Sequence, residues 1–556
     1  MNPGTLVRAA ALAVAVAVSS LAPAAASPHG KQAASDAAAW REDLRVLAAE
    51  LARRHRNLFH HTTRAEFDAA VRALDASIPT LSRHEIVVGF ARIVAMASDG
   101  HTQLRGFPFH PAYGLRFFPV GLYHFKDGVH IYAADAKYRD AVGGRVISVG
   151  GRPAAEALAA VEGFISRDNA MGARLYGPYM LMVPEVLNAA RIVDDMERVP
   201  LVVERDGNRT TVTLEPAPAP RLHGPPVGFF RAPDWVDARD LARPPLWLER
   251  AGEPFWFKHL EESRTLYVQY NAVANRQDET VEAFAKRLFA FAENHPVDRI
   301  VFDLRWNGGG NNSLNRPLLL GLVKSRFDAP GKVFVLTSRH TFSAAQNFVN
   351  VFDRFTNATF VGEPTGARPN HYGDARPFRL PHSGFEVYAS TLWWQDMDPR
   401  DDRPWTPPDV AVELSFAEYR SGVDPVLAAA IAFVPQPPLA ERMSDAYAAG
   451  DAWLAAKLFR EFRADPAHAY ASVERDLNRL GYTLLGGGRV DAAIGVFKPV
   501  VEADPVSWNA YDTPAEAYLK SGNRELARRN YERSLELNPD NAGAVQALEG
   551  LRTVPD

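Results

Sequence analysis

Strand-like and helix-like segments alternate from Thr265 onward, and this alternation constrains the fold more than any other feature of the sequence. The strand-like runs are TLYVQY, RIVFDL and KVFVLT. Helix-like segments lie at residues 281–294, 314–324 and 344–352. Strands that alternate with helices predict an α/β layer with a mostly parallel sheet. We assign this region to residues 257–435.

The region before it divides into a helical part and a β part. In residues 30–105, Trp40, Leu44, Leu47 and Leu51 recur at helical spacing, and further helical runs cover 64–74 and 83–96. We expect a small helical bundle whose third helix stops at Gly100.

Residues 112–216 contain short β-type runs broken by glycine turns, then a strand, a tight turn and a helix, and then a hairpin across Asp206-Gly207. This order resembles a PDZ domain with a helical insertion near residues 165–195. PDZ domains bind an extended peptide as an added strand. The alternative is a β-rich structural domain. Residues 217–256 are rich in Pro, Arg and Trp, and we interpret them as a linker or a loop over the site.

The C-terminal region, residues 438–552, repeats with a period of 34. Gly488 and Gly522 are separated by this period, and so are Pro505 and Pro539. The period and pattern are those of tetratricopeptide helix–turn–helix repeats, whose concave face binds peptides or proteins. We therefore expect a protein partner at these repeats, with a purely stabilising appendage as the alternative.

The first 26 residues have the pattern of a signal peptide. Arg8 precedes an apolar run from Ala9 to Leu21, and Ala24-Ala25-Ala26 is a small-residue cleavage site. The run is too short to span a bilayer, so we predict export to a periplasm or to the outside. An uncleaved anchor is the alternative. No later stretch reaches about 18 apolar residues, so no stable membrane insertion is expected after cleavage.

Composition excludes several classes of function. The chain has 556 residues, a net charge of −4 and no cysteine. Without a basic excess, nucleic-acid binding is not expected. The lack of cysteine excludes a disulfide framework and a cysteine nucleophile. His60 and His61 are adjacent rather than spaced on one helix face, and no Asp-rich calcium loop occurs, so neither a metal nor a cofactor is expected.

Two segments at strand ends carry the candidate chemistry. Ser343 follows KVFVLT and begins a helix, where orphan N–H groups and the helix dipole stabilise negative charge. The same placement suits a structural N-cap. Asn307-Gly308-Gly309-Gly310 follows RIVFDL, and its free N–H groups could bind an oxyanion. Both segments are expected at one edge of the sheet.

The sequence resembles a known family at four motifs: FDLRWNGGG, TSRHTFSAAQNF, GEPTGARPN and WTPPDV. They look like the core motifs of the tail-specific protease, tricorn and interphotoreceptor retinoid-binding protein family of serine peptidases. The resemblance covers about residues 36–430 and implies a multidomain α/β fold. It implies a crotonase-like β/α core, an N-terminal helical segment and a PDZ domain. It also implies that Ser343 is the nucleophile, with an oxyanion hole from Ala344 and from Gly309 or Gly310.

The resemblance also indicates which residue is the general base for Ser343. Where tail-specific proteases have a lysine base, this chain has Arg368, which does not give up its proton. Lys324 and Lys332 precede the serine at unsuited places. The tricorn-like design uses a histidine in a DxHT-like motif, which Asp99-Gly100-His101-Thr102 fits. We therefore predict His101 as the general base.

The remaining candidates are weaker. The histidines His340 and His371 do not match the family motif. The family's orienting carboxylate lies seven residues before Asp409, at Asp402, with Asp398 and Asp401 as rivals.

Two functions follow from these assignments. The first is an exported, cofactor-free serine endopeptidase that cleaves polypeptides through an acyl-enzyme. The second is an inactive ligand- or protein-binding scaffold on the same fold.

Overall fold

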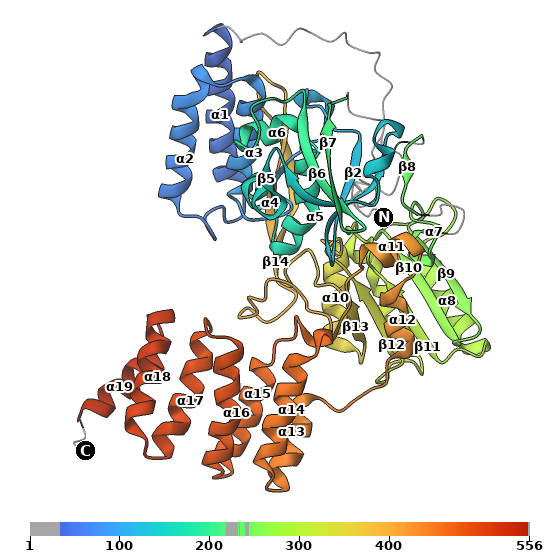
Figure 1. Ribbon diagram of the computed structural model, residues 1–556. Coiled ribbons are helices and arrows are strands. Elements are labelled where there is room, and N and C mark those ends of the chain that lie inside the picture. Colours follow the sequence, from blue (N-terminus) through green and yellow to red (C-terminus); the bar gives the residue numbers. More distant parts are fainter. Residues whose placement is uncertain (1–33, 218–228, 230–231, 233, 240–243, 554–556) are drawn as a thin grey trace, which may run out of the picture. The chain divides into compact units, whose positions relative to one another are not determined.

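The computed structural model describes residues 34–217, 229, 232, 234–239 and 244–553 (Figure 1). The signal peptide predicted over residues 1–26 lies outside these residues. The chain forms two compact units. One extends to Pro408 and includes Val412–Phe433, and the other contains Asp409–Ala411 and the chain from Val434 onward. Within the described residues, no helix combines the length and apolar character needed to cross a membrane.

The first unit begins with the predicted helices, α1 (Ala34–Arg54), α2 (Arg64–Ser77) and α3 (Arg83–Ala95). The face predicted for α1 is buried, with Leu47 and Leu51 fully covered, because apolar residues at helical spacing share one side of the helix. The prediction that Gly100 ends α3 is wrong. Ser98 takes the left-handed conformation, with φ 49°, and Gly100 has another role described below.

The β domain is a sheet in the order β2-β3-β4-β6-β7. Its strands are β2 (Val120–Phe125), β3 (Gly128–Ala134), β4 (Arg145–Val149), β5 (Arg152–Pro153), β6 (Val199–Arg205) and β7 (Asn208–Leu214). The predicted hairpin is confirmed, because β6 and β7 pair antiparallel across Asp206-Gly207. The predicted helix after the tight turn is α4 (Ala154–Val161), and the insertion contains α5 (Ala170–Leu181) and α6 (Pro184–Ala189).

The predicted parallel layer is also present. Its strands lie in the order β13-β12-β11-β10-β9. They are β9 (Phe255–Leu260), β10 (Thr265–Tyr270), β11 (Arg299–Asp303), β12 (Val333–Thr337) and β13 (Thr359–Gly362). The pairs from β10 to β13 are parallel, and β9 adds an antiparallel edge. Helices α8 (Val281–Asn294), α9 (Arg316–Val323) and α10 (Ala344–Phe355) fall within the predicted helical segments or extend them.

A third sheet joins the front of the chain to this layer. It has the order β1-β15-β14, from β1 (Gln103–Leu104), β14 (His371–Arg379) and β15 (Glu386–Trp394). Gln103 pairs with Tyr388, and Leu104 pairs with Val387. This pairing fixes the chain immediately after His101 against a hairpin that follows Ser343.

The described part of residues 217–256 is more structured than a linker. It contains β8 (Val236–Asp237), which pairs with β3, and α7 (Leu246–Glu249). Trp235 and Trp247 are buried with Phe125 and Tyr419 in an aromatic cluster. The remaining elements are β16 (Val410–Ala411), α11 (Phe416–Ser421) and α12 (Pro425–Ala432).

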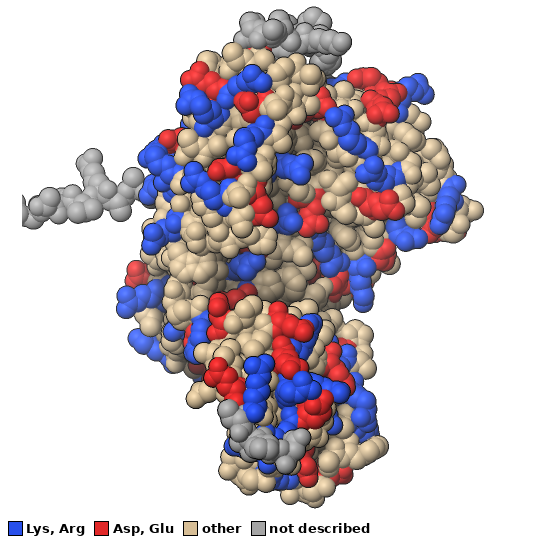
Figure 2. All heavy atoms as spheres, turned by 90° about the vertical axis from the view of Figure 1, so that its left-hand side faces the viewer, with Lys and Arg blue, Asp and Glu red and all other residues tan. Residues whose placement is uncertain are grey.

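The second unit contains a row of helices with its own apolar core. They are α13 (Leu439–Ala448), α14 (Ala452–Ala464), α15 (Glu474–Gly486), α16 (Val490–Ala503), α17 (Trp508–Lys520), α18 (Arg524–Leu537) and α19 (Ala542–Thr553). Gly450, Gly488 and Gly522 lie between successive helices with φ of 77°, 76° and 81°. Glycine tolerates this conformation, which explains why Gly488 and Gly522 recur at the period of 34, whereas Gly450 lies 38 residues before Gly488. On the face shown in Figure 2, basic and acidic side chains are interspersed.

Candidate active site

Ser343 lies at the turn between β12 and α10 in a strained backbone conformation. Its φ is 52° and its ψ is −127°, a region that residues other than glycine rarely occupy. The serine is the N-terminal flanking residue of α10, yet its side chain makes no capping hydrogen bond. The structural N-cap interpretation is therefore wrong. Strain without a capping bond is typical of functional positions, where it holds a side chain in a specific direction.

The glycine run lies directly against this serine. A side chain at Gly309 would have its Cβ 2.6 Å from Ser343 Cβ and 2.8 Å from Ala344 N. Gly310 is equally constrained, because a Cβ there would lie 2.3 Å from Val273 O. By contrast, a Cβ at Gly308 would meet nothing within 4 Å. Both strand ends thus meet at one edge, as expected.

Asn307 holds the two segments together. Its backbone carbonyl accepts from Phe342 N at 3.0 Å, and its side-chain amide donates to Tyr270 O at 2.8 Å. Its Oδ1 accepts from Gly309 N at 3.0 Å, so that N–H is occupied. The N–H groups of Gly310 and Ala344 have no hydrogen-bond partner within the described residues. Of the two glycines predicted for the oxyanion hole, Gly309 therefore has its N–H occupied, whereas the N–H groups of Gly310 and Ala344 could donate to an oxyanion.

His101 reaches this edge from the front of the chain. Its ring stacks on Phe342, the residue before Ser343, with centroids 4.5 Å apart. Gly100 permits this approach, because a Cβ there would lie 2.7 Å from Phe342 Cζ. Both ring nitrogens are buried and lack a hydrogen-bond partner in the part of the chain that the structure describes. The imidazole is thus beside the serine segment but is not hydrogen-bonded to Ser343 Oγ.

Asp99 is the carboxylate that faces His101. Its Oδ1 lies 3.8 Å from His101 Nδ1 and accepts from the His101 backbone N at 2.9 Å. Its Oδ2 accepts from Thr102 Oγ1 at 2.6 Å and lies 3.1 Å from His55 Nε2. Asn57 N donates to His55 Nδ1 at 3.0 Å, so Nε2 carries the proton donated to Asp99. Asp99 is therefore held in one orientation by three neighbours.

The charges around His101 favour its protonated form. Burial alone would lower the pKa of its imidazole, but the Asp99 carboxylate outweighs burial and raises the pKa above the ordinary value. Burial would likewise raise the pKa of Asp99, but His101 and His55 hold it far below the usual range. With Nδ1 toward Asp99, Nε2 is the nitrogen left to take a proton from a substrate-side group.

The rival histidines have the opposite electrostatics. Burial lowers the pKa of His340 to about 3, with Arg339 adding to the effect. Burial and the neighbouring His101 lower the pKa of His371 to about 3. His340 packs on Trp306, and His371 Nδ1 lies 3.1 Å from Arg368 O. Among the three histidines, His101 is the one whose pKa is raised rather than lowered, which suits it best to hold a proton.

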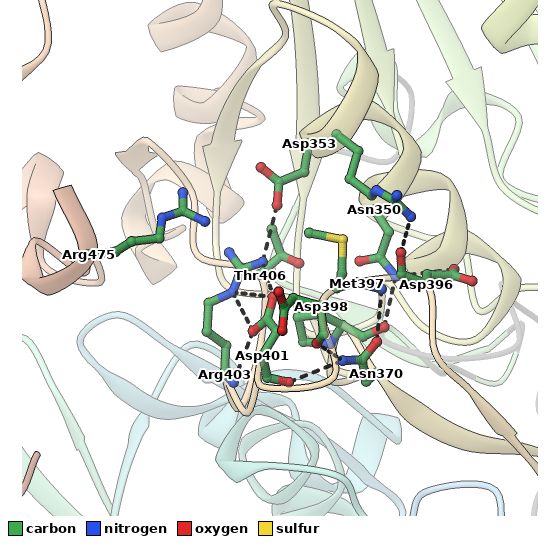
Figure 3. Close-up of polar contacts among 12 residues, drawn as sticks. Asn350, Asp353, Asn370, Asp396, Met397, Asp398, Asp401, Arg403, Thr406 and Arg475 are labelled. Atoms are coloured by element: carbon green, nitrogen blue, oxygen red, sulfur yellow. Dashed lines mark hydrogen bonds and ion pairs between the residues drawn. The ribbon is translucent and has the colours of Figure 1, made fainter. Parts of the chain in front are cut away.

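Asp402 and its rivals lie on the loop after β15, and the structure does not bring them to His101. Asp402 is exposed. Asp398 pairs with Arg400 at 2.9 Å, and Asp401 pairs with Arg403 at 2.7 Å. Figure 3 shows the Asp401 side chain directed at Arg403, whose Nη2 also lies 3.2 Å from Asp353. Among the described contacts, Asp99 occupies the place that the sequence assigned to Asp402.

The loop also explains why α10 is polar on one side. Gln346, Asn347 and Asn350 on α10 are buried, and the last two donate to Asp396 in this loop. Figure 3 shows Asn350 beside Asp396. Asn370 donates to the backbone carbonyls of Asp398 and Asp401. Asp396 thus ties this loop to α10.

Arg368 occupies the place of the lysine base and serves as a structural donor. Its Nε donates to Asp168 O at 3.0 Å, and its backbone N donates to Asp168 Oδ2 at 3.3 Å. Within the described residues, no group of three His, Asp or Glu side chains could hold a metal ion.

No protein-family model matches the sequence, and no match was found among curated proteins. Solved structures do show similarity. Mature CPAF complexed with lactacystin is 12% identical, with 69% of this chain and 95% of that chain covered and a TM-score of 0.49. The photosystem II D1 C-terminal processing protease is 12% identical, with 67% and 93% covered and a TM-score of 0.32. The first TPR of Spaghetti (RPAP3), bound to an HSP90 peptide, is 21% identical, with 20% and 87% covered and a TM-score of 0.16.

The structural neighbours therefore include proteases of the tail-specific kind, and tetratricopeptide proteins at lower coverage.

Proposed function

We propose that this chain is a serine endopeptidase that cleaves polypeptides through an acyl-enzyme. The observation that carries the proposal is the placement of Ser343. It is a strained serine at the start of a helix, it lies against a glycine run, and the neighbouring Phe342 ring stacks on the His101 imidazole. A serine that only caps a helix would not need these three features together.

The reaction uses the residues as follows. His101 Nε2 takes the proton of Ser343 as Oγ forms a bond with the scissile carbonyl carbon. The N–H groups of Gly310 and Ala344 stabilise the resulting oxyanion. The C–N bond then breaks, and His101 gives the proton to the leaving amine. Water attacks the ester with His101 again as base, which releases the acid and restores the serine.

Asp99 supports the imidazolium that forms in these steps. Its carboxylate faces Nδ1, and its contacts with His55 and Thr102 prevent it from turning away. The geometry thus favours Asp99 over Asp402 as the orienting carboxylate. The hydrogen bond between Ser343 and His101 forms when substrate closes the site, as such bonds tighten in the complex.

The other parts of the chain suit a role in handling polypeptide. The signal peptide predicted over residues 1–26 supports export to a periplasm or to the outside. The β domain, if it acts as a PDZ domain, would add a substrate tail as a strand. The helical row from α13 to α19 would bind a protein partner.

Hydrolysis of an unstructured polypeptide by the purified chain tests the proposal. The wild-type chain should cleave it, Ser343→Ala should lose the activity, and Ser421→Ala, at an exposed serine, should keep it. Activity that survives in Ser343→Ala would contradict the nucleophile assignment. A folded wild-type chain with no activity would favour the binding scaffold instead.

A further inference from the structure

Two buried residues of the β domain, Asp168 and Asn169, contact three separate segments of the candidate site. They lie immediately before α5, in the helical insertion, and are 5% and 7% exposed. Asp168 Oδ1 accepts from Gly100 N at 2.7 Å, and Oδ2 accepts from Arg368 N. Asn169 Nδ2 donates to the carbonyls of Thr365 at 3.1 Å and Pro404 at 2.6 Å.

These bonds fix the turn that carries His101. Gly100 N donates to the Asp168 carboxylate, and a Cβ at Gly100 would lie 2.7 Å from the Phe342 ring and 3.3 Å from Asp168 Oδ1, so both groups pack closely against this turn. A backbone N–H that donates to a buried carboxylate makes a strong hydrogen bond that is costly to break. Moving Asp168 would therefore release the backbone next to the imidazole. Asn169 anchors the same insertion to the carbonyls of Thr365 and Pro404, which follow Ser343 in the chain. The insertion is therefore attached to the candidate site through both Asp168 and Asn169.

We propose that Asp168 is a positioning residue for His101, through which the helical insertion of the β domain holds the base in place for Ser343. The inference rests on the proposed peptidase function. Asp168 touches no reacting atom. It acts on the Gly100 backbone and on the electric field at the imidazole.

The charges around Asp168 and His101 provide a measurable quantity that does not depend on folding alone, the pKa of the His101 imidazole. The carboxylates that face His101 are Asp99, Asp168 and Asp374, and each of them raises the imidazole pKa. Asp168 itself faces Asp99, His101 and the Arg368 segment. Burial raises the pKa of Asp168 to about 6, and Asp99 adds to the rise. Removing the Asp168 charge should lower the His101 pKa, which a purely structural residue would not do.

The test compares Asp168→Asn and Asp168→Ala with Asp195→Ala in the full chain. Asp195 is an exposed residue of the same domain whose carboxylate also accepts from a backbone N–H, that of Glu197 at 2.8 Å. Two quantities are measured: peptide turnover, and the pH titration of the His101 imidazole by NMR, assigned by its loss in His101→Gln.

We expect Asp168→Ala to lower kcat by about 10- to 100-fold, because a misplacement of about 1 Å has such effects, with a smaller change in KM. The isosteric Asp168→Asn keeps an acceptor for Gly100 and should lose less turnover. Both variants should lower the His101 pKa, and Asp195→Ala should change neither quantity.

Unchanged kcat in Asp168→Ala, or an unchanged His101 titration in Asp168→Asn, would overturn the inference. If Asp168→Ala does not fold, the isosteric variant decides. A wild-type chain without turnover would contradict the proposed function, and the titration would still decide whether Asp168 acts on His101.

Discussion

The contact between Gly309 and Ser343 offers a sharp test, because two neighbouring glycines differ completely in their surroundings. The Cβ of Gly309→Ala would lie 2.6 Å from Ser343 Cβ and 3.0 Å from Phe342 O, and φ at this residue is 108°. Carbon atoms in contact normally lie about 3.5–4.0 Å apart, so something must move by about 1 Å. Gly308→Ala is the matched control, since its Cβ meets nothing within 4 Å.

The expected loss follows from this displacement. The atoms that must give way are those of the nucleophile and of the Ala344 N–H, so both the attack and the oxyanion hole are disturbed. A displacement of about 1 Å costs about 100-fold in rate, and the loss of one oxyanion donor costs about 100- to 1000-fold. We expect kcat/KM to fall about 100-fold in Gly309→Ala and to change within about twofold in Gly308→Ala.

Folding must be separated from chemistry in this comparison. Strain at a positive φ costs roughly 1–3 kcal/mol, which is less than the stability of about 5–15 kcal/mol typical of a domain. Circular dichroism and thermal melting should therefore show a folded chain in both variants. Peptide hydrolysis at saturating and limiting substrate then gives kcat and kcat/KM. Equal activity in the two folded variants would refute the proposed role of the glycine run.

Further predictions concern the base, its carboxylate and the repeats. Because Asp99 raises the pKa of His101, kcat/KM should fall as the pH decreases through a value above 6.5, and a flat profile from pH 5 to 8 would exclude His101 as base. Asp99→Asn should lower kcat by roughly 10²–10⁴-fold, whereas Asp402→Asn should leave it within about twofold, and the reverse order would restore Asp402 as the orienting carboxylate. A chain truncated after Gln436 should fold and cleave small peptides, since the first unit is compact up to Phe433. Aggregation of the truncated chain would show that its stability depends on the repeats.

The parts of the fold that follow from local sequence pattern are predictable. The spacing of Leu44, Leu47 and Leu51 determines the buried face of α1, and the strand and helix runs from β10 to α10 are where periodicity places them. The period of 34 marks Gly488 and Gly522, two left-handed glycines between helices of the second unit. In each case a short-range pattern decides the local structure.

Pairings between distant segments are not available to such reasoning. The hairpin of β14 and β15 and its pairing with the short β1 depend on register, and Gln103 and Leu104 alone do not have the pattern of a strand. Yet this sheet secures the chain beside His101. The same limit affected Asp402: its spacing matched a motif, whereas the structure orients Asp99, two residues before the histidine, toward the ring. The short separation of Asp99 and His101 in the sequence is the feature from which this contact could have been predicted.

The role of single backbone groups was also beyond the sequence. The sequence does not distinguish Gly309 from Gly310. In the structure, Asn307 Oδ1 accepts a hydrogen bond from the N–H of Gly309 but not from that of Gly310. Likewise, nothing in the residues around Asp168 indicates that its carboxylate meets Gly100.

Labelling of Ser343 by a fluorophosphonate, measured across pH in the wild-type chain and in His101→Gln, tests the pairing of serine and histidine most directly. Mass spectrometry should locate the adduct on Ser343, and the labelling rate should rise with pH through a single ionisation that disappears, together with most of the rate, in the variant. Labelling of His101→Gln at the wild-type rate and with the wild-type pH dependence would contradict the account.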